Sequence, residues 1–106
     1  RTHSSLCARR VLTMDFMEAI PLLSLPKSPE AKAVDTKLLM ESIVDAFGIM
    51  IFRDGFFHAD PHPGNFLVKP DSSSAAGAVA VLLDFGLVRE LSTTERVALC
   101  RVIASI

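Results

Sequence analysis

The chain contains the run His58-Ala59-Asp60-Pro61-His62-Pro63-Gly64-Asn65 and, after two short apolar runs, Asp84-Phe85-Gly86. An Asp, an Asn five positions later and a distant Asp-Phe-Gly form the spacing that phosphoryl-transfer enzymes use. In that arrangement one carboxylate orients the attacking group, while an amide oxygen and a second carboxylate hold the magnesium ion that carries the nucleotide phosphates. We therefore predict that Asp60 is catalytic and that Asn65 and Asp84 bind metal and cofactor.

The elements expected around these motifs bring them together. A helix is predicted from an N-cap at Asp35 to about residue 52, with one apolar stripe. Residues 66–68 and 79–83 are predicted to form a hairpin with an enlarged, flexible tip, treated as a surface insertion. Asn65 precedes its first strand and Asp84 follows its second, so both are expected at the open end of the hairpin, around one ion. The stripe of the helix consists of Leu39, Ile43, Ala46, Phe47 and Met50.

The flanking segments carry further expectations. Residues 10–17 are predicted as a strand that leaves a core, and the prolines in residues 21–34 predict a loop with little regular structure. Ser92-Thr93-Thr94-Glu95 resembles a helix start. Within Asp84-Phe85-Gly86, the ring is expected to pack under the ion site, and the glycine to permit a turn that a Cβ would oppose. The helix that follows is expected to pack on the core through Leu99, Val102, Ile103 and Ile106.

Composition limits the class of protein. The 106 residues are 50% hydrophobic with a net charge of −1, which suits one domain or part of a larger one and gives no electrostatic reason to expect nucleic acid. Cys7 and Cys100 are isolated, so no zinc site or disulfide framework is indicated, although a single disulfide stays open. The longest apolar stretch, residues 75–83, is too short for a bilayer span of ~20 residues. The chain opens without Met or a secretory signal, and we expect both ends to be cuts through a longer protein.

Two histidines flank Asp60 and allow a second interpretation. His58, Asp60 and His62, with Asp84 as a further ligand, could form the transition-metal cluster of a hydrolase. We favour a structural role, in which both rings bond to loop backbone and brace Asp60 and Asn65. Residues 14–18 are likewise open to two interpretations, because adenine could pair with their exposed backbone groups or they could simply end a core strand.

The run Phe57-His58-Ala59-Asp60-Pro61-His62-Pro63-Gly64-Asn65, with Leu82-Leu83-Asp84-Phe85-Gly86-Leu87-Val88, closely resembles the UbiB family of atypical protein-kinase-like proteins. Members of that family are linked to ubiquinone and related prenyl-lipid metabolism in bacteria, mitochondria and plastids. The resemblance implies an α+β fold, a protein-kinase-like C-lobe fragment that is mainly helical with a small antiparallel β-hairpin. Residues 1–18 would be the last N-lobe strand and the hinge, and residues 19–106 the C-lobe.

The same resemblance implies ATP and Mg²⁺ as cofactors. Asp60 matches the catalytic-loop aspartate, and Asn65 and Asp84 match the two metal-binding residues. The hinge residues expected to hold the nucleotide are Met14, Asp15, Phe16 and Met17, with Met14 at the gatekeeper position. Ala59 stands where typical protein kinases have arginine, which argues against a switch based on a phosphorylated activation loop. The nucleotide-binding lysine and the Lys-x-Gly-Gln segment would lie upstream, so we expect this chain to carry half an active site and to be inactive alone.

The implied function is a kinase or ATPase that transfers or hydrolyses the terminal phosphate of ATP. By resemblance, the acceptor would be small or lipid-associated, with peripheral membrane association in the intact protein. The location would be mitochondrion or plastid, or the membrane in a bacterium. Two alternatives stay open: a small-molecule phosphotransferase of the aminoglycoside or choline type, which shares His-Pro-Gly-Asn, and a non-catalytic nucleotide-binding scaffold.

Overall fold

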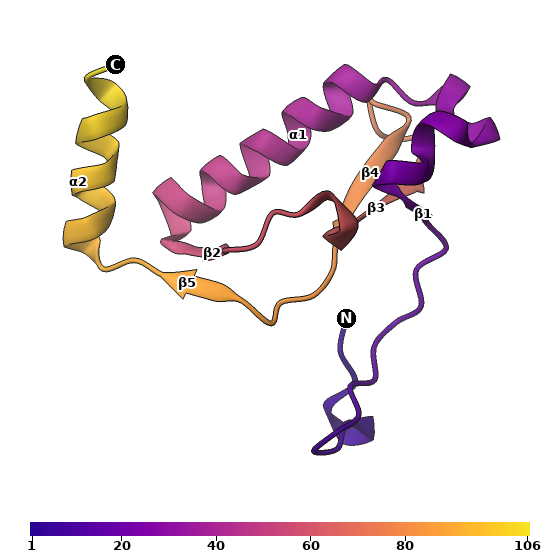
Figure 1. Ribbon diagram of the computed structural model, residues 1–106, viewed down its shortest axis with the longest axis horizontal. Coiled ribbons are helices and arrows are strands. Elements are labelled where there is room, and N and C mark those ends of the chain that lie inside the picture. The colour runs from indigo at the N-terminus through magenta and orange to yellow at the C-terminus, as the bar shows by residue number, and fades with distance from the viewer.

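Helix α1 (Thr36–Gly48) begins where the sequence predicts, because the Asp35 side chain accepts a hydrogen bond from the backbone N–H of Leu38 at 3.1 Å. The helix continues into a π-helical segment, Ile49–Asp54, and ends at Gly55, whose φ of 68° is the left-handed conformation that glycine adopts without strain. The computed structural model describes residues 1–106 and is an α+β fold of helices and two small antiparallel sheets (Figure 1).

The predicted hairpin is present. Strands β3 (Phe66–Pro70) and β4 (Ala78–Leu82) pair antiparallel from Phe66↔Leu82 to Pro70↔Ala78. A short strand, β1 (Ile20–Pro21), adds to the other edge of β3. The hairpin packs on α1, and together with residues before the helix they form the core. That core consists of Leu25, Val34, Leu39, Val68, Ala76 and Ala78.

The hairpin tip lies at the surface at Ser72 and Ser73, as predicted, but it is docked at Ala76, which was not predicted. The backbone N–H of Asp35 donates to the carbonyl of Ala76 at 2.9 Å, and Ala76 is buried. Gly77 has a φ of 71°, and a Cβ there would collide with the carbonyl oxygen of Ala33. Small residues let the tip lie against the chain that enters α1, which fixes the hairpin relative to the helix.

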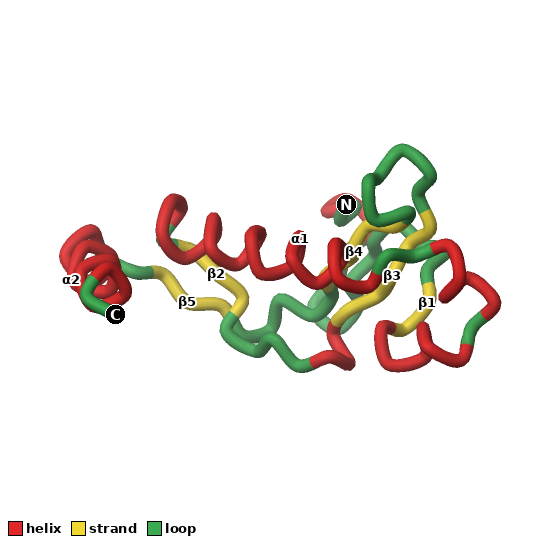
Figure 2. Tube along the Cα trace, turned by 90° about the horizontal axis from the view of Figure 1, so that it is seen from above, coloured by secondary structure: helices red, strands yellow, loops and turns green.

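A second sheet was not predicted. Strands β2 (Phe56–His58) and β5 (Val88–Glu90) pair antiparallel, with Phe56 opposite Glu90 and His58 opposite Val88. Figure 2 shows α1 running between the two sheets, with β2 and β5 toward one end and the β3–β4 hairpin toward the other. The second sheet therefore joins the segment before the first motif to the segment after Asp84-Phe85-Gly86.

Helix α2 (Thr93–Ala104) starts with the predicted capping box. The Ser92 hydroxyl accepts from the N–H of Glu95 at 3.3 Å, and the Glu95 carboxylate accepts from the N–H of Ser92 at 2.8 Å. The expected core packing of α2 was wrong: the helix has no buried residue, and Val102 is 58% exposed. Figure 1 shows α2 standing apart from the body, with its main contact to Ile49–Asp54.

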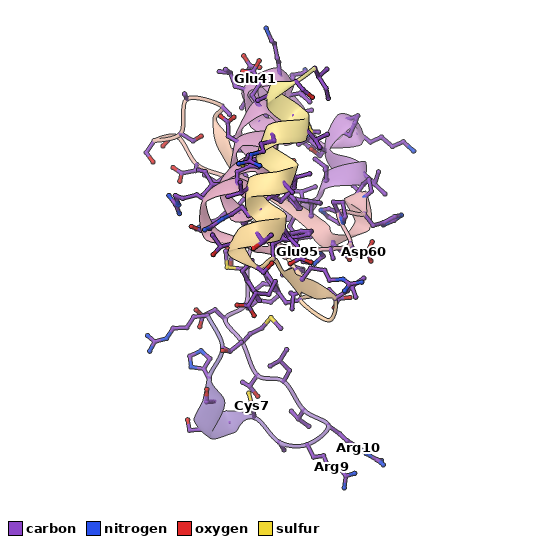
Figure 3. The ribbon with its side chains drawn as sticks, turned by 90° about the vertical axis from the view of Figure 1, so that its left-hand side faces the viewer. Cys7, Arg9, Arg10, Glu41, Asp60 and Glu95 are labelled. Atoms are coloured by element: carbon purple, nitrogen blue, oxygen red, sulfur yellow. The ribbon has the colours of Figure 1, made fainter.

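The predicted strand at residues 10–17 was also wrong. The chain makes only two isolated bridges there, Thr2↔Met14 and Ala8↔Val11, so residues 1–15 fold back on themselves with no sheet beside them. Figure 3 shows Cys7, Arg9 and Arg10 on this segment, which extends away from the body.

Three remaining sequence expectations can be compared with the structure. The loop predicted at residues 21–34 contains two 3₁₀ helices, Leu22–Lys27 and Pro29–Ala33, and is therefore more regular than expected. The disulfide that the sequence left open is not formed, because Cys7 and Cys100 are both free thiols. None of the helices has the length and apolar character that crossing a bilayer requires.

Candidate active site

The loop between β2 and β3 is closed by hydrogen bonds onto Asp60. The Asp60 carbonyl accepts from the N–H of His62 at 2.8 Å and from Nδ2 of Asn65 at 3.1 Å. The N–H of Asn65 donates to the carbonyl of His62 at 2.9 Å. Because Nδ2 of Asn65 is used inside the loop, its Oδ1 is the atom left free to bind a ligand.

The hairpin places Asn65 next to the chain that leads into Asp84. The N–H of Leu83 donates to the carbonyl of Asn65 at 2.8 Å, one pair beyond the last register pair of β3 and β4. The open end of the hairpin therefore brings Asn65 and the start of Asp84-Phe85-Gly86 together, as the sequence predicts.

Within Asp84-Phe85-Gly86, the residue with an unusual backbone conformation is Asp84. Its φ is 58°, the only positive φ outside glycine, a conformation that Asp adopts more readily than most residues. Its Oδ1 accepts from the N–H of Gly86 at 3.1 Å, and a Cβ on Gly86 would lie 3.0 Å from that oxygen. A Cβ at Gly86 would therefore oppose this turn, as the sequence predicts, while the positive φ itself is at Asp84. Oδ2 of Asp84 has no hydrogen-bond partner.

The buried side chain of His58 connects the Asp60 loop to the Asp84-Phe85-Gly86 turn. Its side chain is 2% exposed, its Nε2 lies 2.5 Å from the carbonyl oxygen of Asp84, and its Nδ1 lies 3.2 Å from the N–H of Asp60. Because Nδ1 accepts from a backbone N–H, the ring proton is on Nε2, which donates to Asp84. The structural role predicted for His58 is confirmed by these two bonds.

Phe85 packs on that histidine. The two rings meet edge to face with their centroids 5.4 Å apart. The Phe85 side chain is otherwise 58% exposed and borders a cavity of about 450 Å³ between α1 and the hairpin. The Phe85 ring thus packs against His58, and His58 in turn holds the backbone of Asp84 at the expected ion site.

The alternative metal cluster is not assembled in this geometry. Both ring nitrogens of His58 are bonded to backbone, and Nδ1 of His62 accepts from the N–H of Gly64 at 3.0 Å. No three His, Cys, Asp or Glu side chains are grouped so that they could hold one ion. The histidines brace the loop around Asp60 and Asn65, in agreement with the interpretation that the sequence favoured.

The four predicted hinge residues divide into two pairs. Met14 bridges Thr2, and the Asp15 carboxylate binds Nε2 of His3 at 2.6 Å. The bond to His3 lowers the pKa of Asp15. Phe16 and Met17 instead border a cavity of about 510 Å³ at the far end of β3. Lys69 and Pro70 line its other side.

The oxygen atoms present fit a magnesium ion. Mg²⁺ prefers hard oxygen ligands and is usually bound through one or two carboxylates together with substrate phosphates and water. Oδ1 of Asn65 and Oδ2 of Asp84 are both unpartnered, and each is oriented by the hydrogen bond that the other atom of its group makes. Asp60 is exposed, with no hydrogen bond to its carboxylate oxygens.

Sequence reasoning missed how the chain after Gly86 is held. The N–H of Ala59 donates to the carbonyl of Leu87 at 3.0 Å, and the N–H of Leu91 donates to the carbonyl of Gly55 at 2.7 Å. Together with the β2–β5 pairs, these bonds fix the whole segment against the strand before Asp60. The segments Phe56–His58 and Val88–Glu90 are each three residues long, which is too short for a sequence pattern to predict their pairing.

A long helix, an Asp-containing loop, a hairpin and an Asp-Phe-Gly turn, in this order, define a protein-kinase-like domain. The sequence profile of the ABC1 atypical kinase-like domain matches residues 1–106. The chain therefore belongs to the ABC1 atypical kinase-like family, which confirms the resemblance to UbiB proteins.

Curated relatives agree with this assignment. The chain is 40% identical over 103 residues to the chicken AarF domain-containing protein kinase 1, covering 95% of this chain and 19% of that protein. It is 38% identical over 93 residues to the probable protein kinase UbiB of Marinobacter nauticus, covering 88% of this chain and 16% of the relative. An uncharacterised protein of Synechocystis is 38% identical over 91 residues, or 86% of this chain and 12% of its own. The chain thus spans less than a fifth of the length of these relatives.

Proposed function

We propose that the full-length protein binds Mg²⁺–ATP at this site and transfers or hydrolyses its terminal phosphate. One observation carries the proposal: the hydrogen bonds of the two motifs leave Oδ1 of Asn65 and Oδ2 of Asp84 free, and the Leu83–Asn65 bond holds their backbones side by side. A neutral and a charged oxygen on adjacent strand ends form a donor set for one hard divalent cation. When bound, that ion would neutralise the charge on the phosphates.

The cavity beside Phe16 and Met17 supports a place for the nucleotide base. Asn65 and Lys69 lie at opposite ends of β3, about 13 Å apart at the rise of an extended strand. An extended nucleoside triphosphate can bridge that distance. Its base would lie near Phe16 and its phosphates near Asn65. Neither Phe16 nor Met17 takes part in the backbone hydrogen bonds of the loops, so their N–H and C=O groups are available to a base.

Asp60 is suited to orient the acceptor. Its N–H and its carbonyl are both held by the loop, while its carboxylate is exposed and unpartnered. A fixed backbone with a free carboxylate is what a residue needs to accept the proton of an attacking hydroxyl in a defined position.

The surroundings of Asp60 favour a small acceptor with an apolar part. Residues 87–92 are paired along their length and begin α2 at once, which leaves no free loop after Gly86 to hold an extended peptide. Next to Asp60, Pro61 and Pro63 help to line a cavity of about 350 Å³ whose other walls are apolar. Those walls are Leu22, Met40, Ile43, Val44, Phe47 and Phe66. We extend the proposal on this basis to a lipid-associated acceptor, with the link to prenyl-lipid metabolism and peripheral membrane association resting on the family.

A comparison of two substitutions in the full-length protein tests the proposal. Asp60→Asn should retain Mg²⁺–ATP binding and lose roughly 10²–10⁴-fold in phosphate transfer or release, because the general base is removed. Asp84→Asn should lose Mg²⁺-dependent nucleotide binding with the fold intact. Asp45→Asn, an exposed change on α1, is the matched control and should behave as wild type.

The outcomes distinguish a phosphate-transferring enzyme from a nucleotide-binding scaffold and also test the site itself. Phosphate release at the wild-type rate from Asp60→Asn would contradict the proposed chemistry. Wild-type protein that binds Mg²⁺–ATP through Asp84 but turns over no phosphate would identify a nucleotide-binding scaffold. Nucleotide affinity unchanged by Asp84→Asn, measured by thermal shift, would contradict the site itself.

A further inference from the structure

We propose that His62 is a further residue of this site and that its Nε2–H donates a hydrogen bond to the phosphoryl group during transfer. The inference rests on the proposed function and adds a residue that the function above does not use. His62 is exposed and lies in the middle of the loop that joins Asp60 to Asn65.

The backbone of His62 is fixed from both sides. Its N–H donates to the carbonyl of Asp60 at 2.8 Å, and its carbonyl accepts from the N–H of Asn65 at 2.9 Å. The backbone of His62 is therefore held between the expected base and the expected metal ligand.

The ring is oriented by Gly64. Nδ1 of His62 accepts from the N–H of Gly64 at 3.0 Å, and a Cβ on Gly64 would lie 3.0 Å from Nδ1 and 3.3 Å from Cε1. The absence of a side chain at Gly64 thus lets the ring lie against the loop. Because Nδ1 is an acceptor, the proton of the neutral ring is on Nε2, which has no partner in the protein.

The loop offers few side-chain N–H donors. Between residues 58 and 65, Nε2 of His58 is bonded to the Asp84 carbonyl, and Nδ2 of Asn65 uses one of its two N–H groups for the Asp60 carbonyl. The run contains no Lys or Arg. Nε2–H of His62 is the one ring N–H of the loop that is oriented and unused, as a group that stabilises transition-state charge must be.

The reaction defines what the donor does. The acceptor oxygen forms a bond to the terminal phosphorus, and the bond from that phosphorus to the bridging oxygen of ADP breaks. The acceptor proton passes to the Asp60 carboxylate. Charge is spread over the peripheral oxygens of the transferred group, and Nε2–H of His62 donates to one of them.

Two substitutions separate this role from bracing of the loop. Asn at position 62 offers Oδ1 to the Gly64 N–H in place of Nδ1 but has no atom at the position of Nε2. Gln carries its amide nitrogen close to the position of Nε2 but loses the acceptor near Gly64. The experiment uses full-length protein and measures Mg²⁺–ATP affinity, turnover, and the affinity for ADP with Mg²⁺ and aluminium fluoride, which mimics the transferred group.

We expect His62→Asn to keep Mg²⁺–ATP affinity within about twofold, since it retains the loop bond, and to lose roughly 10²-fold in turnover. It should also lose the tighter binding that aluminium fluoride gives to wild-type protein with ADP. His62→Gln should retain more of both. The reverse order, with His62→Asn like wild type and His62→Gln impaired, would overturn the inference and leave a bracing role. Wild-type protein with neither Mg²⁺-dependent nucleotide binding nor turnover would overturn the proposed function and this inference together.

Discussion

The buried ring of His58 donates from Nε2 to the carbonyl of Asp84, 2.5 Å away, and so joins the two motifs across 26 positions of sequence. The same ring accepts from the N–H of Asp60. One side chain therefore sets the distance between the expected base and the strained backbone of the expected metal ligand.

Replacing the His58 ring by an apolar one should lower both the stability of the fold and its Mg²⁺-dependent nucleotide affinity. His58→Phe keeps a ring next to Phe85 but leaves the Asp84 carbonyl and the Asp60 N–H without partners, which should cost roughly 1–3 kcal/mol of unfolding free energy. Mg²⁺-dependent nucleotide binding should weaken as well, because Asp84 loses its support. Denaturant unfolding and nucleotide titration of the full-length protein measure the two effects. Asp45→Asn, an exposed change on α1 at a carboxylate without a hydrogen bond, is the control, and equal effects of the two substitutions would contradict the special role of His58.

Replacement by Ala should have opposite effects at Gly77, in the docked hairpin tip, and at Gly48, in helix α1. Gly77→Ala should destabilise the protein by about 2–4 kcal/mol, since it combines a left-handed φ with a collision against the Ala33 carbonyl. Gly48→Ala should stabilise it by about 0.5–1 kcal/mol, because the position is helical and no atom lies within 4 Å of the new Cβ. Thermal unfolding of both variants tests this pair. A Gly77→Ala protein as stable as wild type would show that the tip is not docked.

The capping box of α2 should make that helix sensitive to acid. The Ser92 hydroxyl and then the Ser92 N–H donate to Glu95, so they hold the pKa of Glu95 below its ordinary value. A carboxylate whose folded-state pKa is lowered stabilises the structure above about pH 4.3, its ordinary pKa, and the contribution is lost as pH falls through the folded pKa.

Hydrogen exchange over residues 92–104 measures this effect. At neutral pH, Glu95→Gln should exchange faster than wild type in the first turn of α2, and the difference should shrink as the pH falls through the lowered pKa of Glu95. Glu30→Gln, at an exposed glutamate without a hydrogen bond, should match wild type at neutral and at low pH. A Glu95→Gln difference that persists undiminished at low pH would contradict the cap.

Local signals in the sequence predicted much of the fold. The Asp35 cap and the Ser92–Glu95 box fix the helix starts by bonds within three residues, and the apolar runs at residues 66–68 and 79–83 identify β3 and β4 within two residues. The hairpin in turn predicted that Asn65 and Asp84 approach. These features were accessible because each depends on neighbours in sequence or on one simple connection.

Features that depend on distant partners were not accessible. The three-residue strands β2 and β5 are too short for a periodic pattern, and their pairing is set by the path of the chain around His58. The left-handed backbone of Asp84 was not predicted, because the carbonyl of that residue is held by the distant ring of His58. The stripe of α2 and residues 10–17 are apolar in sequence, yet whether they are buried depends on which surface lies beside them.

The most direct test is a titration of full-length protein and ATP with Mn²⁺, in which free Mn²⁺ is followed by electron paramagnetic resonance. Wild-type protein should bind one ion with ATP, and Asn65→Ala and Asp84→Asn should each weaken it by at least tenfold, the range already seen for groups that only support metal ligands. Asp45→Asn should leave the affinity unchanged. Unchanged Mn²⁺ affinity in either Asn65→Ala or Asp84→Asn would contradict the claim that these two residues hold the same ion.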